Sequence, residues 1–221
     1  MQAIGHILPF ALAVALSSVP IMATIFILLS PNRSRSALPF LIGWVIGLIV
    51  VVCACALLAQ VVPTARLPRQ PDTAVGSIEI VVGLALVALA LLTLRHARRQ
   101  TEHNVPKWLR SAGNLGPWQS FGLALILNVR PKAVLLAIAA GLTIRADADS
   151  LTDALVAILI YTVIAASTVA APIIGTLAAP ARMEPRLVSM RVWLLRNGEA
   201  LGAVIGLVIG VVIVGMGLGR L

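Results

Sequence analysis

Two cations, an amide and a proline interrupt a long apolar stretch in the second half of the chain. Asn128, Arg130, Pro131 and Lys132 lie inside the otherwise apolar run from Phe121 to Ile144. A charged side chain at the bilayer centre costs about 2.5–3.5 kcal/mol on insertion scales, so such residues usually mark a substrate or ion pathway. A proline inside a helix removes a backbone hydrogen bond and bends or breaks the helix. The combination predicts an anion-attracting site at a broken membrane helix.

A similar motif occurs near the start of the chain. Pro20 corresponds to Pro131, and Ser17 corresponds to Asn128 three positions before its proline. Each proline is expected to free a carbonyl about one turn earlier, and each polar residue to cap the half-helix that follows. The positive N-terminal ends of both half-helices would then lie beside the two cations. The alternative is a pair of packed proline kinks, with both cations reaching toward the cytoplasm.

Composition and the lengths of the apolar runs predict the fold class. The 221 residues are 60% hydrophobic and 11% charged, with a mean hydropathy of +1.03, whereas a soluble domain is about half apolar and a quarter charged. We therefore predict an all-α integral membrane protein with six transmembrane helices in one domain. The predicted spans are Ile4–Leu29, Ala37–Ala59, Val75–Leu94, Trp118–Ile144, Leu151–Leu177 and Ala200–Leu218.

The spacing of the two motifs also predicts internal symmetry. Three spans separate them, so the broken first and fourth spans cross the membrane in opposite directions. This pattern is typical of two inverted three-helix repeats, which place a substrate site at the membrane midplane. Repeat one would cover residues 1–95, a basic linker 96–116, and repeat two 117–221.

The basic residues predict the orientation in the membrane. The formal charge of +9 does not indicate nucleic-acid binding, because the chain has no basic helix with interleaved aromatic residues. Eleven cations fall in the loops after spans one, three and five, and four fall on the other side. The positive-inside rule then places both termini on the extracytoplasmic side of the plasma (inner) membrane. The eleven are Arg33, Arg35, Arg95, Arg98, Arg99, Lys107, Arg110, Arg182, Arg186, Arg191 and Arg196.

Few acidic residues are placed to balance the mid-span cations. Glu79, about one turn inside the third span, could pair with Arg130 or Lys132 or serve as a proton-coupling carboxylate. Glu184 and Glu199 are expected at the cytoplasmic interface. The histidines and cysteines form no metal-ligand pattern, so no metal and no cofactor are predicted.

Glycines repeat every four residues along the sixth span and its approach. This spacing gives a helix one flat face, which favours close helix packing within the chain or across a homodimer. The glycines are Gly198, Gly202, Gly206 and Gly210.

The two motifs resemble a known family. The segments Leu16-Ser17-Ser18-Val19-Pro20 and Leu127-Asn128-Val129-Arg130-Pro131-Lys132-Ala133 are similar to those of mycobacterial proteins that address peptidoglycolipids and sulfolipids, within the superfamily of lysine-exporter-like transporters. The resemblance implies help in exporting a complex envelope glycolipid, with membrane lipids as partners, alongside a larger lipid-export pump. Amino-acid exporters of that superfamily carry an Asn-Pro-Lys triplet, into which Val129 and Arg130 are inserted here.

Three function classes follow. The first is a transporter or export accessory for an anionic or glycosylated lipid. The second is an exporter of an amino acid, cation or metal, which would need midplane acids, and only Glu79 comes near. The third is a scaffold that packs through its glycines. An enzyme is not expected, because no nucleophile–base pair, metal cluster or phosphate-binding loop is present.

Overall fold

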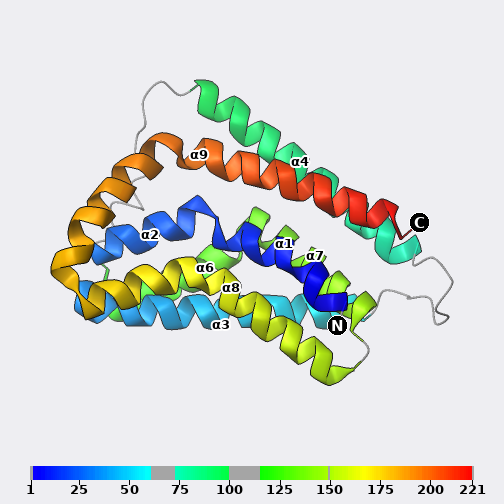
Figure 1. The fold of residues 1–221 in the computed structure, drawn as a ribbon, viewed down its shortest axis with the longest axis horizontal. Coiled ribbons are helices and arrows are strands. Elements are labelled where there is room, and N and C mark those ends of the chain that lie inside the picture. The colour runs from blue at the N-terminus through cyan, green and yellow to red at the C-terminus, as the bar shows by residue number, and fades with distance from the viewer. Residues whose placement is uncertain (1, 61–72, 100–114, 149, 221) are drawn as a thin grey trace.

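The computed structural model describes residues 2–60, 73–99, 115–148 and 150–220, and every regular element in these ranges is an α-helix (Figure 1). In a bilayer the backbone must satisfy its own hydrogen bonds, and a helix does so within one segment. The elements are α1 (Gln2–Ala15), α2 (Ser18–Leu28), α3 (Arg33–Ala59), α4 (Thr73–Arg99), α6 (Pro117–Asn128), α7 (Pro131–Asp147), α8 (Leu151–Ala178) and α9 (Pro180–Leu218).

Four helices, α3, α4, α8 and α9, are long and apolar enough to cross a membrane, which indicates a multi-pass membrane protein. Two further candidates are bent pairs. The α1–α2 pair bends by 47° and the α6–α7 pair by 63°, so the chain has up to six spans if each pair counts as one. The predicted break in the first and fourth apolar runs is therefore present in both.

The prolines do not break these helices in the expected way. Pro20 is the third residue of α2, and Pro131 is the first residue of α7. Amide groups in the first turn of a helix have no intrahelical partner, so a proline there costs no hydrogen bond and helps to begin the helix. Each break precedes its proline, at residues 16–17 and 129–130.

The polar residues of the two motifs are likewise not equivalent. Ser17 is the N-cap of α2, although its side chain makes no capping hydrogen bond. Arg130, not Asn128, is the N-cap of α7. The predicted capping role of Asn128 is wrong, because Asn128 is the last residue of α6. Its side-chain amide donates a hydrogen bond to the carbonyl oxygen of Ala124, one turn earlier in the same helix.

The expected loop between the fifth and sixth spans is also wrong. Residues 180–199 form the first half of α9, which is continuous for 39 residues. This half is amphipathic, with Leu187, Leu194 and Gly198 buried along one face. The 39 residues follow about 58 Å of helix axis at 1.5 Å per residue, and the helix bends along its course (Figure 1).

Helices α4 and α9 lie antiparallel along one side of the molecule (Figure 1). Glycines let their backbones meet: a Cβ on Gly83 would lie 2.8 Å from the carbonyl oxygen of Gly210, and a Cβ on Gly76 would lie 2.7 Å from that of Gly217. The other helices form the main bundle, whose core includes the fully buried Trp44. We refer to the two antiparallel helices as the α4–α9 pair.

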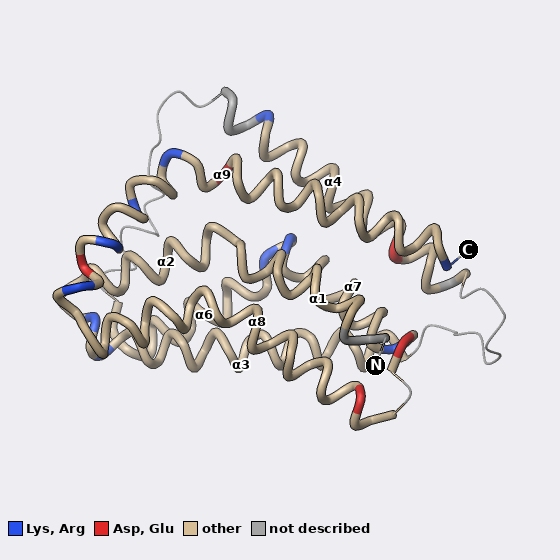
Figure 2. The backbone as a smooth tube through the Cα atoms, in the orientation of Figure 1, with Lys and Arg blue, Asp and Glu red and all other residues tan. Residues whose placement is uncertain are grey.

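The outer surface and the charge distribution agree with a membrane setting. Large apolar side chains such as Leu58, Val81 and Leu159 are exposed on outward faces, where lipid would cover them. Figure 2 shows that Lys and Arg gather mainly at the end of the bundle opposite the two termini, with a smaller group in its interior.

Candidate functional site

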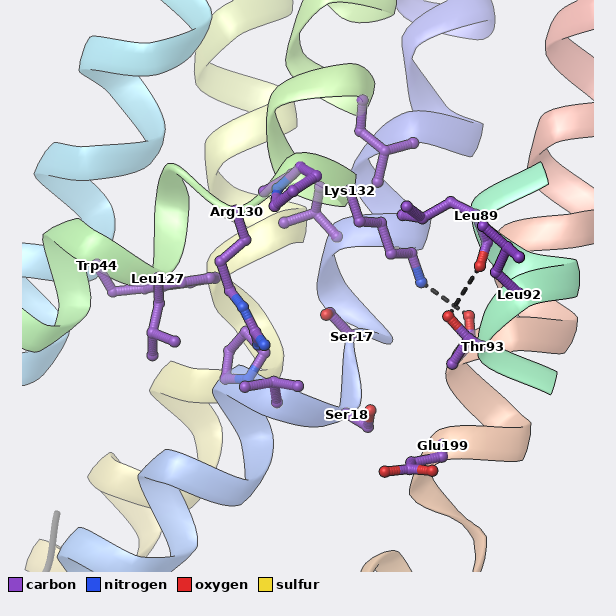
Figure 3. Close-up of a pocket in the computed structure, with 17 residues that line it drawn as sticks. Ser17, Ser18, Trp44, Leu89, Leu92, Thr93, Leu127, Arg130, Lys132 and Glu199 are labelled. Atoms are coloured by element: carbon purple, nitrogen blue, oxygen red, sulfur yellow. Dashed lines mark hydrogen bonds between the residues drawn. The ribbon is translucent and has the colours of Figure 1, made fainter. Parts of the chain in front are cut away.

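A cavity of about 450 Å³ lies where the two helix breaks meet the α4–α9 pair (Figure 3). Its walls are mostly apolar, and its polar groups come from both breaks and from both helices of the pair. The lining residues are Val14, Ser17, Ser18, Val19, Pro20, Trp44, Leu89, Leu92, Thr93, Leu127, Arg130, Pro131, Lys132, Ala133, Leu136, Glu199 and Gly202.

Lys132 crosses the cavity from α7 to α9. Its Nζ donates a hydrogen bond of 2.9 Å to the carbonyl oxygen of Gly202. Gly206 leaves room for the side chain, since a Cβ there would lie 3.8 Å from Nζ. The ammonium group is thus held by a neutral acceptor, and its charge remains to attract an anion.

Arg130 is the second cation in the cavity wall. It stands at the break between α6 and α7 as the N-cap residue. Figure 3 shows the two cationic side chains diverging: Lys132 extends toward Thr93 of α4, and Arg130 extends on the side of Leu127. The two charges therefore lie in different parts of one cavity.

The breaks also bring two helix N-termini to the cavity. The first turns of α2 and α7 contribute Ser18, Pro20 and Lys132 to its lining. Amide groups at a helix N-terminus favour negative charge, and here they lie beside two full positive charges. The arrangement suits an anionic group such as a sulfate, phosphate or carboxylate.

Thr168 of α8 secures the first break. Its Oγ1 donates a 2.6 Å hydrogen bond to the carbonyl oxygen of Ala15, the last residue of α1. The break leaves that carbonyl without a partner in its own helix.

Replacing Thr168 with valine is expected to lower the stability of the protein by about 1–2 kcal/mol, because the buried carbonyl of Ala15 loses its donor. Ser167→Ala is the matched control, since the Ser167 hydroxyl is exposed and bonds within α8 to Ile164. Thermal unfolding in detergent measures both variants. Equal shifts in the two would contradict the assignment.

Five of the residues predicted as a substrate site come together in the cavity wall: Ser17, Pro20, Arg130, Pro131 and Lys132.

Asn128 does not line the cavity. It is 2% exposed, and its Nδ2 lies 3.0 Å from the carbonyl oxygen of Ala124 and 3.5 Å from that of Trp44. A Cβ on Gly47 would lie 2.5 Å from the same nitrogen. Asn128 thus joins α6 to α3.

Glu79 is also absent from the cavity. Its Oε2 lies 3.2 Å from Nε of Arg220, so the predicted pairing with Arg130 or Lys132 is wrong. Glu79 lies ten residues before Leu89, the first cavity residue of α4, so it is far along the helix from the two cations.

Four polar or aromatic lining residues were not predicted: Ser18, Trp44, Thr93 and Glu199. Glu199 was expected at the interface, but it lines the cavity because α9 continues unbroken through Gly202. Had residues 180–199 been recognised as helix, Glu199 would have been expected on the same helix face as Gly202, three residues later. Glu184 pairs with Arg33 at 3.6 Å, and both side chains are exposed.

The glycines of α9 contact two different neighbours. A Cβ on Gly198 or Gly202 would meet Ser18 of α2, and one on Gly210 would meet Val87 of α4 at 2.7 Å. The contacts lie within one chain. Gly217, outside the predicted stripe, makes an equally close approach to α4.

Comparison with known proteins gives one family. A family model described as "Sap, sulfolipid-1-addressing protein" matches residues 7–219, which include both helix breaks and the α4–α9 pair. Searches of the curated proteins and of the solved structures found no match.

Proposed function

Because the chain belongs to the sulfolipid-1-addressing protein family, we propose that it helps to move an anionic glycolipid of the cell envelope across or out of the plasma (inner) membrane. The observation that carries the proposal is the cavity in which Arg130 and Lys132 meet two helix breaks. The cavity receives the charged headgroup of the lipid.

The size and chemistry of the cavity support a headgroup site. A volume of about 450 Å³ falls in the usual range for ligand sites, about 300–1,000 Å³, but is small for a multi-chain lipid. The acyl chains would therefore stay in the bilayer while the headgroup enters. Two cations and one carboxylate, Glu199, leave a net positive lining that favours a sulfated or phosphorylated headgroup.

The proposal includes an orientation and a symmetry. The distribution of arginines supports an orientation with both termini on the extracytoplasmic side. The α1–α2 pair runs opposite to the α6–α7 pair, since His6 near the start of α1 contacts Asp147 at the end of α7. This supports two inverted repeats that meet at the cavity.

Lipid analysis of a deletion strain tests the proposed function. Deletion is expected to deplete an anionic glycolipid from surface extracts while whole-cell levels persist, and the unchanged gene is expected to restore the surface pool. Arg130→Gln and Lys132→Gln should restore it poorly. Arg33→Gln, at an exposed pair far from the cavity, should restore it fully.

Two results would contradict lipid movement. One is an unchanged surface lipid profile in the deletion strain. The other is full restoration by a variant that lacks both cavity cations. Normal lipids together with a defect in amino-acid or cation efflux would instead favour a small-solute exporter.

A further inference from the structure

A continuous ionic network joins four parts of the chain at the end that carries both termini. Nδ1 of His6 lies 2.8 Å from Oδ2 of Asp147, and Nη2 of Arg220 lies 2.9 Å from the same oxygen. Nε of Arg220 lies 3.2 Å from Oε2 of Glu79. The hydroxyl of Thr143 donates to the other oxygen of Glu79 at 3.4 Å. The network thus links α1, α4, α7 and the residues after α9.

The side chain at one end of this network is half-exposed, and the side chain at the other end is buried. The side chain of His6 is 49% exposed, those of Asp147 and Arg220 are 13% and 14% exposed, and that of Glu79 is fully buried. A proton from the solution at this end therefore reaches His6 first and Glu79 last.

The charges of the network do not balance without a proton. Two carboxylates face one guanidinium, which leaves one negative charge in an apolar setting where unpaired charge is costly. One proton, on His6 or on a carboxylate, makes the network neutral. This count favours a site that binds a proton.

Other charged groups nearby do not supply the missing charge. Among the described residues, Arg145 of α7 forms no ion pair with Asp147 or Glu79. Asp153 of α8 is hydrogen-bonded to Ser150. No group of three or more His, Cys, Asp or Glu in the described ranges could hold a metal ion, so a metal does not balance the network either.

The network lies beyond the cavity along three helices. Glu79 is ten residues from Leu89, and Asp147 is eleven residues from Leu136, so about 15 Å of helix separates each carboxylate from the cavity. The intervening layer is closely packed and includes the buried Leu86 and Ile213. The network therefore fastens the α4–α9 pair to α1 and α7 on one side of the cavity.

We propose that His6, Asp147, Arg220 and Glu79 form a proton-binding site that opens the cavity toward the end carrying the termini. A proton that enters by way of His6 and passes to Asp147 or Glu79 neutralises that carboxylate and weakens its attraction to Arg220. A proton that stayed on His6 would instead strengthen the pair of His6 with Asp147. The α4–α9 pair then separates from α1 and α7, and loss of the proton closes the site again. The inference rests on the proposed function, because it describes how access to the lipid cavity is controlled.

Thiol labelling of the cavity tests the site without measuring lipid transport. Ser18→Cys, in a background with Cys53→Ala and Cys55→Ala, places one reactive thiol in the cavity wall. A membrane-impermeant thiol reagent is added from the side of the termini, in vesicles of defined orientation. The labelling rate is divided by that of a small free thiol under the same conditions, because loss of the thiolate at low pH slows both reactions. Lowering the pH from about 7.5 to about 5.5 should raise this ratio, by up to about tenfold per pH unit for one proton.

Two variants imitate the protonated network. Glu79→Gln and Asp147→Asn should be labelled rapidly at both pH values, whereas Glu184→Gln, at the exposed pair of the opposite end, should behave like the parent. A ratio of parent labelling to free-thiol labelling that does not change with pH overturns the proposal, and this measurement needs no network variant to fold. Labelling that responds to pH while lipid export proceeds without the cavity cations would keep the proton site and refute the lipid function.

Discussion

Binding of a sulfated glycolipid to the purified protein is expected to weaken by about a hundredfold or more when Arg130 and Lys132 are both replaced by glutamine. Hydrogen bonds to charged groups contribute about 1.5–3 kcal/mol each, and about 1.4 kcal/mol corresponds to a tenfold change in affinity. Both cations line the same cavity, so on the proposed function both would contact a bound headgroup. Equilibrium binding of labelled lipid to protein in neutral-lipid nanodiscs measures the loss.

The single variants and a neutral lipid make this prediction specific. Lys132→Gln also removes the charged donor to the carbonyl of Gly202, so its effect should include some loosening of α7 from α9. Arg33→Gln should bind like the parent, because its ion pair with Glu184 is exposed. A glycolipid that lacks the sulfate should bind weakly and equally to the parent and to every variant. If its affinity fell as much as that of the sulfated lipid, the cations would serve folding and not recognition.

Replacing Gly210 with leucine is expected to cost at least about 3 kcal/mol, the upper part of the range for overpacked interiors. A Cβ at this position would lie 2.7 Å from Cγ2 of Val87 and 2.9 Å from the carbonyl oxygen of Gly83. The second contact is with helix backbone, which cannot turn aside as a side chain can. The α4–α9 pair must therefore separate, and yield and thermal stability in detergent should both fall sharply.

Gly215→Leu is the matched control on the same helix. A Cβ on Gly215 meets nothing within 4 Å, so this variant should unfold close to the parent temperature. Gly206→Ala should also be tolerated, because its nearest neighbour would be Ala90 at an ordinary contact distance of 3.5 Å. Comparable losses at positions 210 and 215 would show that helix propensity, and not the approach to α4, decides stability.

Sequence patterns identified the helices more reliably than the contacts between them. Apolar runs predicted the membrane segments because burial in lipid depends on the composition of a segment alone. The two prolines correctly marked both breaks, although each begins a half-helix instead of interrupting one. The segment with the arginines after α8 was predicted to be a loop, because charged residues usually face solvent. The arginines gave no indication that Leu187 and Leu194 are buried on one face of a helix.

The site was predictable in part for the same reason. Arg130 and Lys132 stood out because charge is rare inside apolar runs, and both line the cavity. Asn128 was predicted to belong to the same site. Its amide instead bonds to the carbonyl oxygen of Trp44 in α3, a residue that is distant in the sequence and is brought close only by the fold. The pair of Glu79 with Arg220 joins residues 141 positions apart, and local patterns carry no information about such partners.

The broken helices bear on how the chain enters the membrane during synthesis. The halves α1 and α6 have 14 and 12 residues, each too short to cross the hydrocarbon layer alone. The α6–α7 pair also carries Arg130 and Lys132 in its middle, whereas α3 is long and strongly apolar. We therefore expect α3 to insert early. We expect α1 to reach its final position only after α8 has been made, because the hydroxyl of Thr168 in α8 bonds to the carbonyl oxygen of Ala15 at the end of α1. The first helix of the chain is among the last to be fixed in place.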